Sequence, residues 1–186
     1  MDPDEIIMNT EEGMEKAVNY LTHEFATVRT GKASPSLVEG IDVQAYGATM
    51  KLKQLALISS PEPRLLVINP FDAATTQAIE KAIKESNIGI QPSVDGKIIR
   101  LPIPALSEER RRDLVKTVKH IAEETRVRIR SSRRDGMEGL KKAQKEGAIT
   151  EDDLGKFEKD VQKLTDDYGK KVDASFAAKE ADIMKV

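Results

Sequence analysis

The chain has 186 residues, of which 39% are hydrophobic and 33% charged, and this balance suits one or two soluble domains with an ample apolar core. It contains no cysteine, which excludes disulfides, thiolate catalysis and cysteine-based zinc sites and is typical of the reducing cytosol. No apolar run approaches the ~20 residues that span a bilayer, and Met1–Glu5 lacks the basic start of a signal peptide. We therefore expect a cytoplasmic protein that does not engage a membrane.

The formal net charge of −2 conceals an uneven distribution. Residues 1–30 carry 2 basic and 7 acidic groups (−5), residues 31–106 carry 8 and 7 (+1), residues 107–146 carry 13 and 8 (+5), and residues 147–186 carry 7 and 10 (−3). Only the third segment is basic. A weakly acidic chain with one cationic element can bind a polyanion such as nucleic acid through that element.

In chain order, the first predicted element is a long helix that runs to about Arg29. Asp2 can cap it, and Pro3 suits its first turn. Gly13 lies inside the helix and lowers its propensity by roughly 1 kcal/mol. A recurrent apolar stripe outweighs this cost: Ile7, Met14, Val18, Leu21, Phe25 and Val28.

Residues 31–104 predict a small α+β domain. Asp72 is the predicted cap of its helix, and Asp95-Gly96 is a strong turn pair. The predicted elements are strands at 41–46, 55–58 and 64–68, a helix at 73–86 and a strand at 97–101.

Long helices lie on both sides of this domain, so it interrupts a helical domain. Two connections, residues 30–34 and 101–105, must then join the domains, which makes them candidate hinges. The hinge residues that we expect are Thr30, Gly31, Pro102, Pro104 and Ala105.

Residues 107–146 predict one helix of roughly 40 residues, about 60 Å long at a rise of ~1.5 Å per residue. Ser107 can cap it, Glu108 and Glu109 suit its positive end, and Gly147 ends it. At about 100° per residue, one sector carries the predicted buried face. Its members are Leu114, Val118, Ile121, Thr125, Ile129, Ser132, Leu140 and Ala143.

An adjacent sector about 60° wide carries five basic residues, which we call the arginine stripe, and no carboxylate other than Glu108. Guanidinium groups match phosphates better than ammonium groups do, which favours a phosphate-binding surface. The alternative is a solvated face whose arginines pair with carboxylates of the other helices. Arg128 points away from the stripe, and for it we prefer this alternative. The stripe consists of Arg112, Lys119, Arg126, Arg130 and Arg133.

A third long helix is predicted after residue 150, because Thr150 and Asp153 resemble a capping box. Its apolar stripe is Leu154, Phe157, Val161, Leu164, Tyr168, Val172 and Phe176. Three amphipathic rods are best buried as a three-helix bundle. The predicted fold is therefore mainly α, of the α+β class. It is a discontinuous bundle of residues 1–30 and 105–186 with the small β/α/β domain inserted at 31–104.

The motifs contain no candidate for catalytic or metal chemistry. His23 and His120 lack partners for a metal site. The adjacent acids Asp152-Asp153 and Asp166-Asp167 point away from each other on a helix. No glycine-rich phosphate loop is present. We therefore expect no catalytic residue, no metal and no cofactor, and we interpret the chain as not an enzyme.

A second basic cluster lies where the first predicted helix ends, at Arg29, Thr30, Gly31 and Lys32. This pattern suits a helix C-terminus, with cations at the negative end and Gly31 as the cap. The alternative is a second cationic site at the junction between the domains.

Five ordered stretches resemble the signature sequences of the bacterial ribosome recycling factor family, and the resemblance spans essentially the whole chain. Lys32 departs from the pattern, because the family more usually has arginine there. A lysine keeps the charge but not the bidentate contact. The five stretches are Arg29–Leu37, Val67–Asp72, Leu106–Arg111, Val127–Asp135 and Asp160–Asp166.

The resemblance implies an L-shaped, monomeric factor whose bundle binds the large ribosomal subunit and its ribosomal RNA, and whose small domain swings about the hinge. Together with elongation factor G, which hydrolyses GTP, such a factor disassembles the post-termination ribosome and releases its subunits from mRNA. By motif, the RNA-contacting residues are Arg29, Lys32, Arg130 and Arg133, and the stripe adds Arg126. The alternatives are a helical chaperone or scaffold that holds protein helices and, more distantly, an enzyme acting through the small domain.

Overall fold

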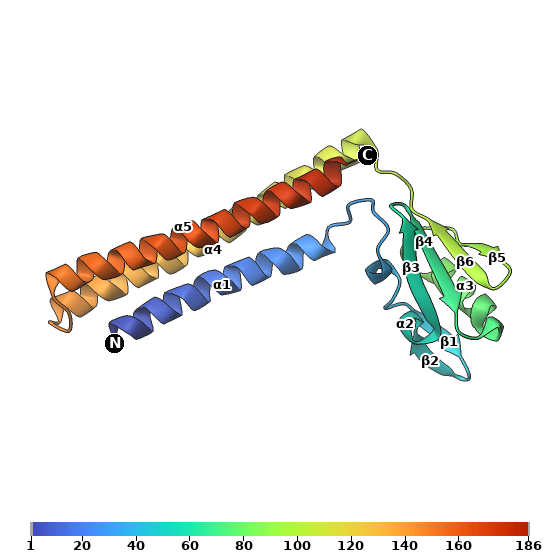
Figure 1. Cartoon of the computed structure of the whole chain (residues 1–186), viewed down its shortest axis with the longest axis horizontal. Coiled ribbons are helices and arrows are strands. Elements are labelled where there is room, and N and C mark those ends of the chain that lie inside the picture. The colour runs from blue at the N-terminus through green and yellow to red at the C-terminus, as the bar shows by residue number, and fades with distance from the viewer. Residues whose placement is uncertain (1, 186) are drawn as a thin grey trace. The chain divides into compact units, whose positions relative to one another are not determined.

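The structure is a computed structural model that describes residues 2–185 (Figure 1). The chain forms two compact units, unit 1 from Met1–Thr30 and Ser107–Val186, and unit 2 from Gly31–Leu106. The terminal residues Met1 and Val186, which the predicted bundle domain includes, lie outside the described residues. The chain passes between the units twice, after Thr30 and after Leu106.

Unit 1 is a bundle of three helices, each of which contacts the other two. Figure 1 shows α4 and α5 running side by side and joined by a short turn. Ser107 caps α4, because its Oγ accepts a hydrogen bond from the Arg110 N–H at 3.1 Å. Thr150 and Asp153 form the predicted capping box of α5. The helices are α1 (Pro3–Thr27), α4 (Glu108–Lys145) and α5 (Glu151–Met184).

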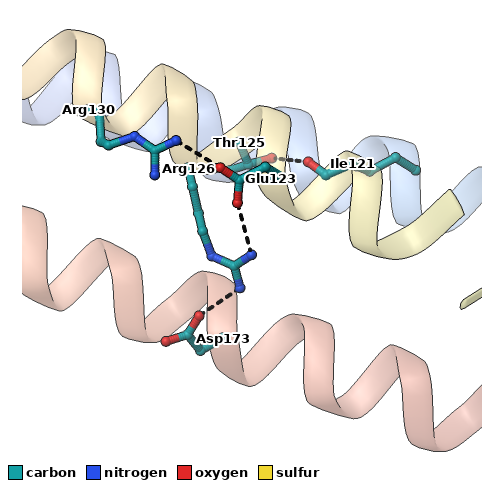
Figure 2. A network of polar contacts seen from close by, with 6 residues as sticks. All are labelled: Ile121, Glu123, Thr125, Arg126, Arg130 and Asp173. Atoms are coloured by element: carbon teal, nitrogen blue, oxygen red, sulfur yellow. Dashed lines mark hydrogen bonds and ion pairs between the residues drawn. The ribbon is translucent and has the colours of Figure 1, made fainter. Parts of the chain in front are cut away.

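The buried face of α4 confirms the helical-wheel prediction, except that Ser132 is only half-buried. Ala122 and Gly136 are buried as well; both fall in the same sector of the wheel but were not included in the predicted face. Thr125 is fully buried, and its hydroxyl donates to the Ile121 carbonyl at 2.9 Å (Figure 2). The buried hydroxyl of Thr125 therefore has its hydrogen-bond partner within its own helix.

Two glycines allow α1 and α4 to approach closely. A Cβ atom at Gly136 would lie 2.3 Å from Thr10 Oγ1, and one at Gly13 would lie 2.5 Å from Ser132 Oγ. Neither distance is sterically possible. Gly13 therefore lies at a point of close helix packing. The helix propensity that α1 loses at Gly13 is offset by the close contact with α4 that this glycine permits.

Unit 2 contains two antiparallel sheets, a hairpin of β1 and β2 and a four-stranded sheet in the order β3-β4-β6-β5. Its core includes Val43, Leu66, Ile79 and Ile99 from strands and helix alike. The elements are β1 (Asp42–Ala45), β2 (Ala48–Lys51), α2 (Leu52–Leu55), β3 (Ala56–Glu62), β4 (Leu65–Pro70), α3 (Thr76–Glu85), β5 (Ser93–Asp95) and β6 (Ile98–Pro102), with single 3-10 turns at Pro35–Leu37 and Ala73–Thr75.

Several local predictions in unit 2 were incomplete. β2, α2 and β5 were not predicted, because each is only three or four residues long and therefore shows little periodicity. The bounds of the strand predicted at 55–58 are wrong, because Leu55 ends α2 and Ser59–Glu62 also belong to β3, where a register shift accommodates them. The predicted fold class, a bundle of long helices with a small inserted sheet unit, is confirmed.

α1 ends earlier than predicted. Its last residue is Thr27, and the N–H of Val28 bonds to the Phe25 carbonyl in a tight final turn. Gly31 has a left-handed φ of +76° but lies beyond the cap, so the interpretation of Gly31 as the helix cap is wrong.

Candidate nucleic-acid interface on the helical bundle

Arg126 joins α4 to α5. Its Nη2 lies 2.8 Å from Asp173 Oδ1 of α5, and its Nη1 lies 3.6 Å from Glu123 Oε2 of its own helix (Figure 2). The side chain is 31% exposed, less than its partners are. Two carboxylates therefore hold this guanidinium in place and offset its positive charge.

Arg130 shares one of these carboxylates. Its Nη2 donates to Glu123 Oε1 at 2.8 Å (Figure 2). The hydrogen bond from Arg130, together with the positive charges of Arg130 and Arg126, lowers the pKa of Glu123 below its usual value. Glu123 therefore stays ionised and holds two arginines of the stripe in place.

Arg133 has a different environment. Its Nε donates to the uncharged Gln162 Oε1 of α5 at 2.9 Å, and the Gln162 Nε2 in turn donates to Asp166 Oδ1 at 2.9 Å. Within residues 2–185, no carboxylate lies within ion-pair distance of Arg133. Arg133 is thus oriented by a neutral partner, and no carboxylate offsets its charge, which leaves the guanidinium available for a phosphate.

The role of Glu123 is not evident from the sequence. On the helical wheel Glu123 falls about 20° outside the sector of the stripe, yet its long side chain reaches Arg126 and Arg130. Arg112 also pairs with a carboxylate of its own helix, Glu108. Pairing with a carboxylate of another helix, the alternative weighed from the sequence, therefore holds for Arg126 and Asp173, whereas Arg112 and Arg130 pair within α4.

Arg128 lies on the other side of α4, as expected, and packs against α1. Its guanidinium carbon is 3.9 Å from the centre of the Tyr20 ring, and the Tyr20 hydroxyl donates to Glu124 Oε2 at 2.9 Å. Such a stacked cation contributes roughly 0.5–1 kcal/mol at an exposed site. Arg128 is therefore a packing residue of the seam between α1 and α4.

The remaining predicted residues lie at the ends of the two units. Arg29 and Lys32 are both exposed, the first in unit 1 and the second in unit 2. Pro102 is the last residue of β6 and pairs with Leu65, so a strand holds it. The other expected hinge residues, Thr30, Gly31, Pro104 and Ala105, lie outside helices and strands.

Across the part of the chain that the structure describes, no group of three or more potential metal ligands converges. In the same residues no helix is long and apolar enough to cross a membrane. Both histidines are exposed, and His120 Nε2 lies 3.5 Å from Glu124 Oε1.

The fold is thus a bundle with one basic helix whose arginines are fixed along its contact with a neighbouring helix, an arrangement suited to a polyanion. The model of the ribosome recycling factor family matches residues 21–184. The ribosome-recycling factor of Akkermansia muciniphila is 53% identical over 188 residues, with all of both chains covered. That of Rubrobacter xylanophilus is 49% identical, with 97% of each chain covered. The chain belongs to the ribosome recycling factor family.

Solved structures agree with this assignment. The solution structure of a ribosome recycling factor superposes with a TM-score of 0.76 at 41% identity and covers 100% of this chain and 99% of that one. Models of the T. thermophilus ribosome recycling factor and the E. coli elongation factor G bound to the E. coli post-termination complex match with a TM-score of 0.65 at 40% identity, with both chains fully covered.

Proposed function

We propose that the protein is a translation factor that works with elongation factor G to disassemble the post-termination ribosome into subunits released from mRNA. The observation that carries this proposal is the full-length similarity to ribosome-recycling factors, with 53% identity and no uncovered segment. Models place the T. thermophilus ribosome recycling factor and the E. coli elongation factor G on the E. coli post-termination complex. We further propose that the protein acts in the cytoplasm as a monomer.

The action that we propose is mechanical. Unit 1 anchors on the ribosomal RNA of the large subunit, and elongation factor G, which hydrolyses the GTP, displaces unit 2. No covalent step by this chain is needed, because the energy comes from binding and from the partner's GTP hydrolysis. The two chain crossings, after Thr30 and after Leu106, are the bending points, the second together with the irregular residues Pro104–Leu106 that lead into it.

Within the anchor, Arg133 is the leading RNA contact. Its charge has no carboxylate partner, whereas Arg126 and Arg130 both share Glu123. If Arg126 or Arg130 bound a phosphate, an existing ion pair would break. The net binding energy that each contributes is therefore smaller than that of Arg133. Arg29 and Lys32 would add exposed cations beside the chain crossing.

The test measures binding to purified large ribosomal subunits across a salt titration. We expect Arg133→Ala to weaken binding and to reduce the slope of log K against log salt by about 1, since one phosphate contact is lost. Arg128→Ala is the matched control, because it removes the same charge from the opposite side of α4. It should leave the slope unchanged.

The same purified protein also serves to test the proposed function itself. The unaltered chain should split post-termination ribosomes only when elongation factor G and GTP are both present, which light scattering detects. Failure to split would refute the proposed function. An unchanged salt slope for Arg133→Ala, beside normal splitting, would refute only the assignment of that residue.

A further inference from the structure

Arg133 uses only one edge of its guanidinium within the bundle. Its Nε donates to Gln162 Oε1 of α5 at 2.9 Å, and within residues 2–185 this side chain has no other hydrogen bond or ion pair. A guanidinium carries five N–H donors in a fixed fork. The four donors on Nη1 and Nη2 therefore have no partner among the described residues. These two nitrogens form an edge that can bind a phosphate through two parallel hydrogen bonds.

Gln162 is itself fixed from its other side. Its Nε2 donates to Asp166 Oδ1 at 2.9 Å, one turn further along α5. A guanidinium only donates hydrogen bonds and an ionised carboxylate only accepts them, so the amide between them has one favourable orientation. If the amide were flipped, both hydrogen bonds would be lost. Gln162 therefore presents an oxygen to Arg133 without presenting a negative charge.

The contact between α4 and α5 also contains an arginine that is held in the opposite way. Arg126 Nη2 lies 2.8 Å from Asp173 Oδ1, and Arg126 Nη1 lies 3.6 Å from Glu123 Oε2 (Figure 2). The two carboxylates occupy the edge that a phosphate would need, and they offset the charge. Arg126 thus ties the two helices together, whereas Arg133 is held at its Nε and keeps its Nη edge open.

Partial burial makes the identity of the partner important. Arg133 and Gln162 are both half-buried. Charges interact more strongly where water is partly excluded, so a carboxylate at position 162 would compete effectively with a phosphate for Arg133. A neutral amide fixes the side chain without this competition. Because Gln162 already restricts the rotamers of Arg133, less conformational entropy is lost when a phosphate binds.

We propose that Gln162 is a positioning residue for the binding of ribosomal RNA. Its amide holds Arg133 by the Nε and leaves the Nη edge for a phosphate, and its neutrality keeps the charge of Arg133 available. The inference rests on the proposed function, because that function supplies the phosphate. Residues 147–186 carry 7 basic and 10 acidic groups, so α5 lies in an acidic segment. It contributes to RNA binding through Arg133 rather than through its own charge.

The test measures binding of the full-length chain to purified large ribosomal subunits across a salt titration. Gln162→Glu keeps the shape of the side chain but gives Arg133 a carboxylate partner. We expect this variant to bind more weakly and to lower the slope of log K against log salt by up to about 1, since the phosphate contact is lost.

Gln162→Met keeps the size of the side chain and removes the hydrogen bond, but it leaves the charge of Arg133 without a carboxylate partner. It should weaken binding by roughly threefold to tenfold at an unchanged salt slope, because Arg133 must then be ordered when the phosphate binds. The two variants therefore separate the neutrality of Gln162 from its hydrogen bond.

A double-mutant cycle separates positioning from a purely structural role. If Gln162 acts through Arg133, Gln162→Met should have no further effect on binding in the Arg133→Ala background. A residue that only holds α5 against α4 would weaken binding by the same factor in both backgrounds. Urea denaturation shows whether each variant is folded. Gln162→Glu retains an acceptor for Arg133, so it tests the proposal even if Gln162→Met does not fold.

Gln144→Glu is the matched control for the added negative charge. Gln144 is the other glutamine of unit 1, and it is half-buried as well. It lies on α4 about three turns beyond Arg133, roughly 16 Å along the helix axis. This separation exceeds the Debye length of about 8 Å at physiological salt. The control should leave both the affinity and the salt slope unchanged.

Three results would overturn the proposal. The first is an unchanged salt slope for Gln162→Glu beside a lowered slope for Arg133→Ala. The second is an equal effect of Gln162→Met in both backgrounds. The third is an unchanged slope for Arg133→Ala, because no phosphate contact would then need positioning. Subunit binding is measured apart from splitting, so each result can occur while the unaltered chain splits ribosomes normally. This distinguishes it from a failure of the proposed function.

Discussion

At the scale of single residues, the contact between α1 and α4 depends on positions without a side chain. Gly136 lies where a Cβ atom would meet Thr10 Oγ1 at 2.3 Å, and Thr10 is itself 4% exposed and bonded to the Ile6 carbonyl at 2.7 Å. Thr10 cannot move aside without losing that bond. Gly136 thus permits the close approach of α1 and α4, because a larger residue at this position would collide with Thr10.

We predict that Gly136→Ala lowers the free energy of unfolding by about 1–3 kcal/mol, as overpacking of a core does. Gly155→Ala is the control, because Gly155 in α5 has nothing within 4 Å of the added Cβ. It should raise stability by about 0.5–1 kcal/mol through helix propensity. Urea denaturation measures both, and the same sign for both variants would contradict the packing argument.

The sequence could predict the positions of the buried residues on each helix but not these close approaches. Periodicity placed Val118 and Ile129 correctly because a wheel needs only one helix. A steric contact needs the partner helix, so Gly13 could be interpreted only as a weak point. The same limit applied to Arg126, whose pairing with Asp173 depends on how α4 and α5 are aligned.

At the scale of elements, α5 begins with a reciprocal cap. The Asp153 N–H donates to Thr150 Oγ1 at 3.1 Å, and the Thr150 N–H donates to Asp153 Oδ2 at 3.2 Å. Hydrogen bonds from the Thr150 hydroxyl and from its backbone N–H lower the pKa of Asp153. The cap therefore requires an ionised carboxylate.

We predict that Thr150→Ala lowers the free energy of unfolding by about 1 kcal/mol at neutral pH. Because the pKa of Asp153 is lower in the folded state, its contribution is complete above the unfolded value and is lost as the pH falls through the folded one. The difference in the free energy of unfolding between Thr150→Ala and the unaltered chain should therefore become smaller at acid pH. Denaturation at neutral pH and near pH 3 tests this; a constant difference would exclude the coupling.

Element prediction was limited by length. The three long helices carry enough repeats for their caps and faces to be recognised, whereas β5 has three residues and is identified only by its pairing with β6. The register between β3 and β4, which pairs Leu57 with Asn69, is likewise a property of two paired strands. For this reason the arginine stripe, which lies on one long helix, could be found from the sequence, whereas the strand registers could not.

At the scale of the whole molecule, the proposed function needs the two chain crossings to bend. Ala105 is exposed, lies between Pro104 and Leu106 outside any helix or strand, and makes no backbone N–H hydrogen bond within residues 2–185. Proline at this position would remove no bond and would stiffen the connection, because two successive prolines favour an extended conformation.

We predict that Ala105→Pro retains binding to the large subunit but slows splitting by elongation factor G. Ala105→Gly, which loosens the same position, should split ribosomes at least as fast as the unaltered chain. Stopped-flow light scattering gives the splitting rates. Full activity of Ala105→Pro would show that bending at this crossing is not required.

The proximity of the two ends of unit 2 has a consequence for how the protein is made. A Cβ atom on Gly31 would lie 3.0 Å from Leu106 Cγ, so the first and last residues of the unit are neighbours. During synthesis α1 emerges from the ribosome long before α4, so its apolar stripe stays exposed until α4 and α5 have been made. Once unit 2 has folded, it joins the end of α1 to the start of α4 as a short loop would. On simple loop-closure grounds it thereby lowers the entropic cost of assembling the bundle by about 2 kcal/mol, the difference between closing residues 31–106 as a flexible loop and closing a short one. The inserted unit can serve the folding of the bundle before it serves the ribosome.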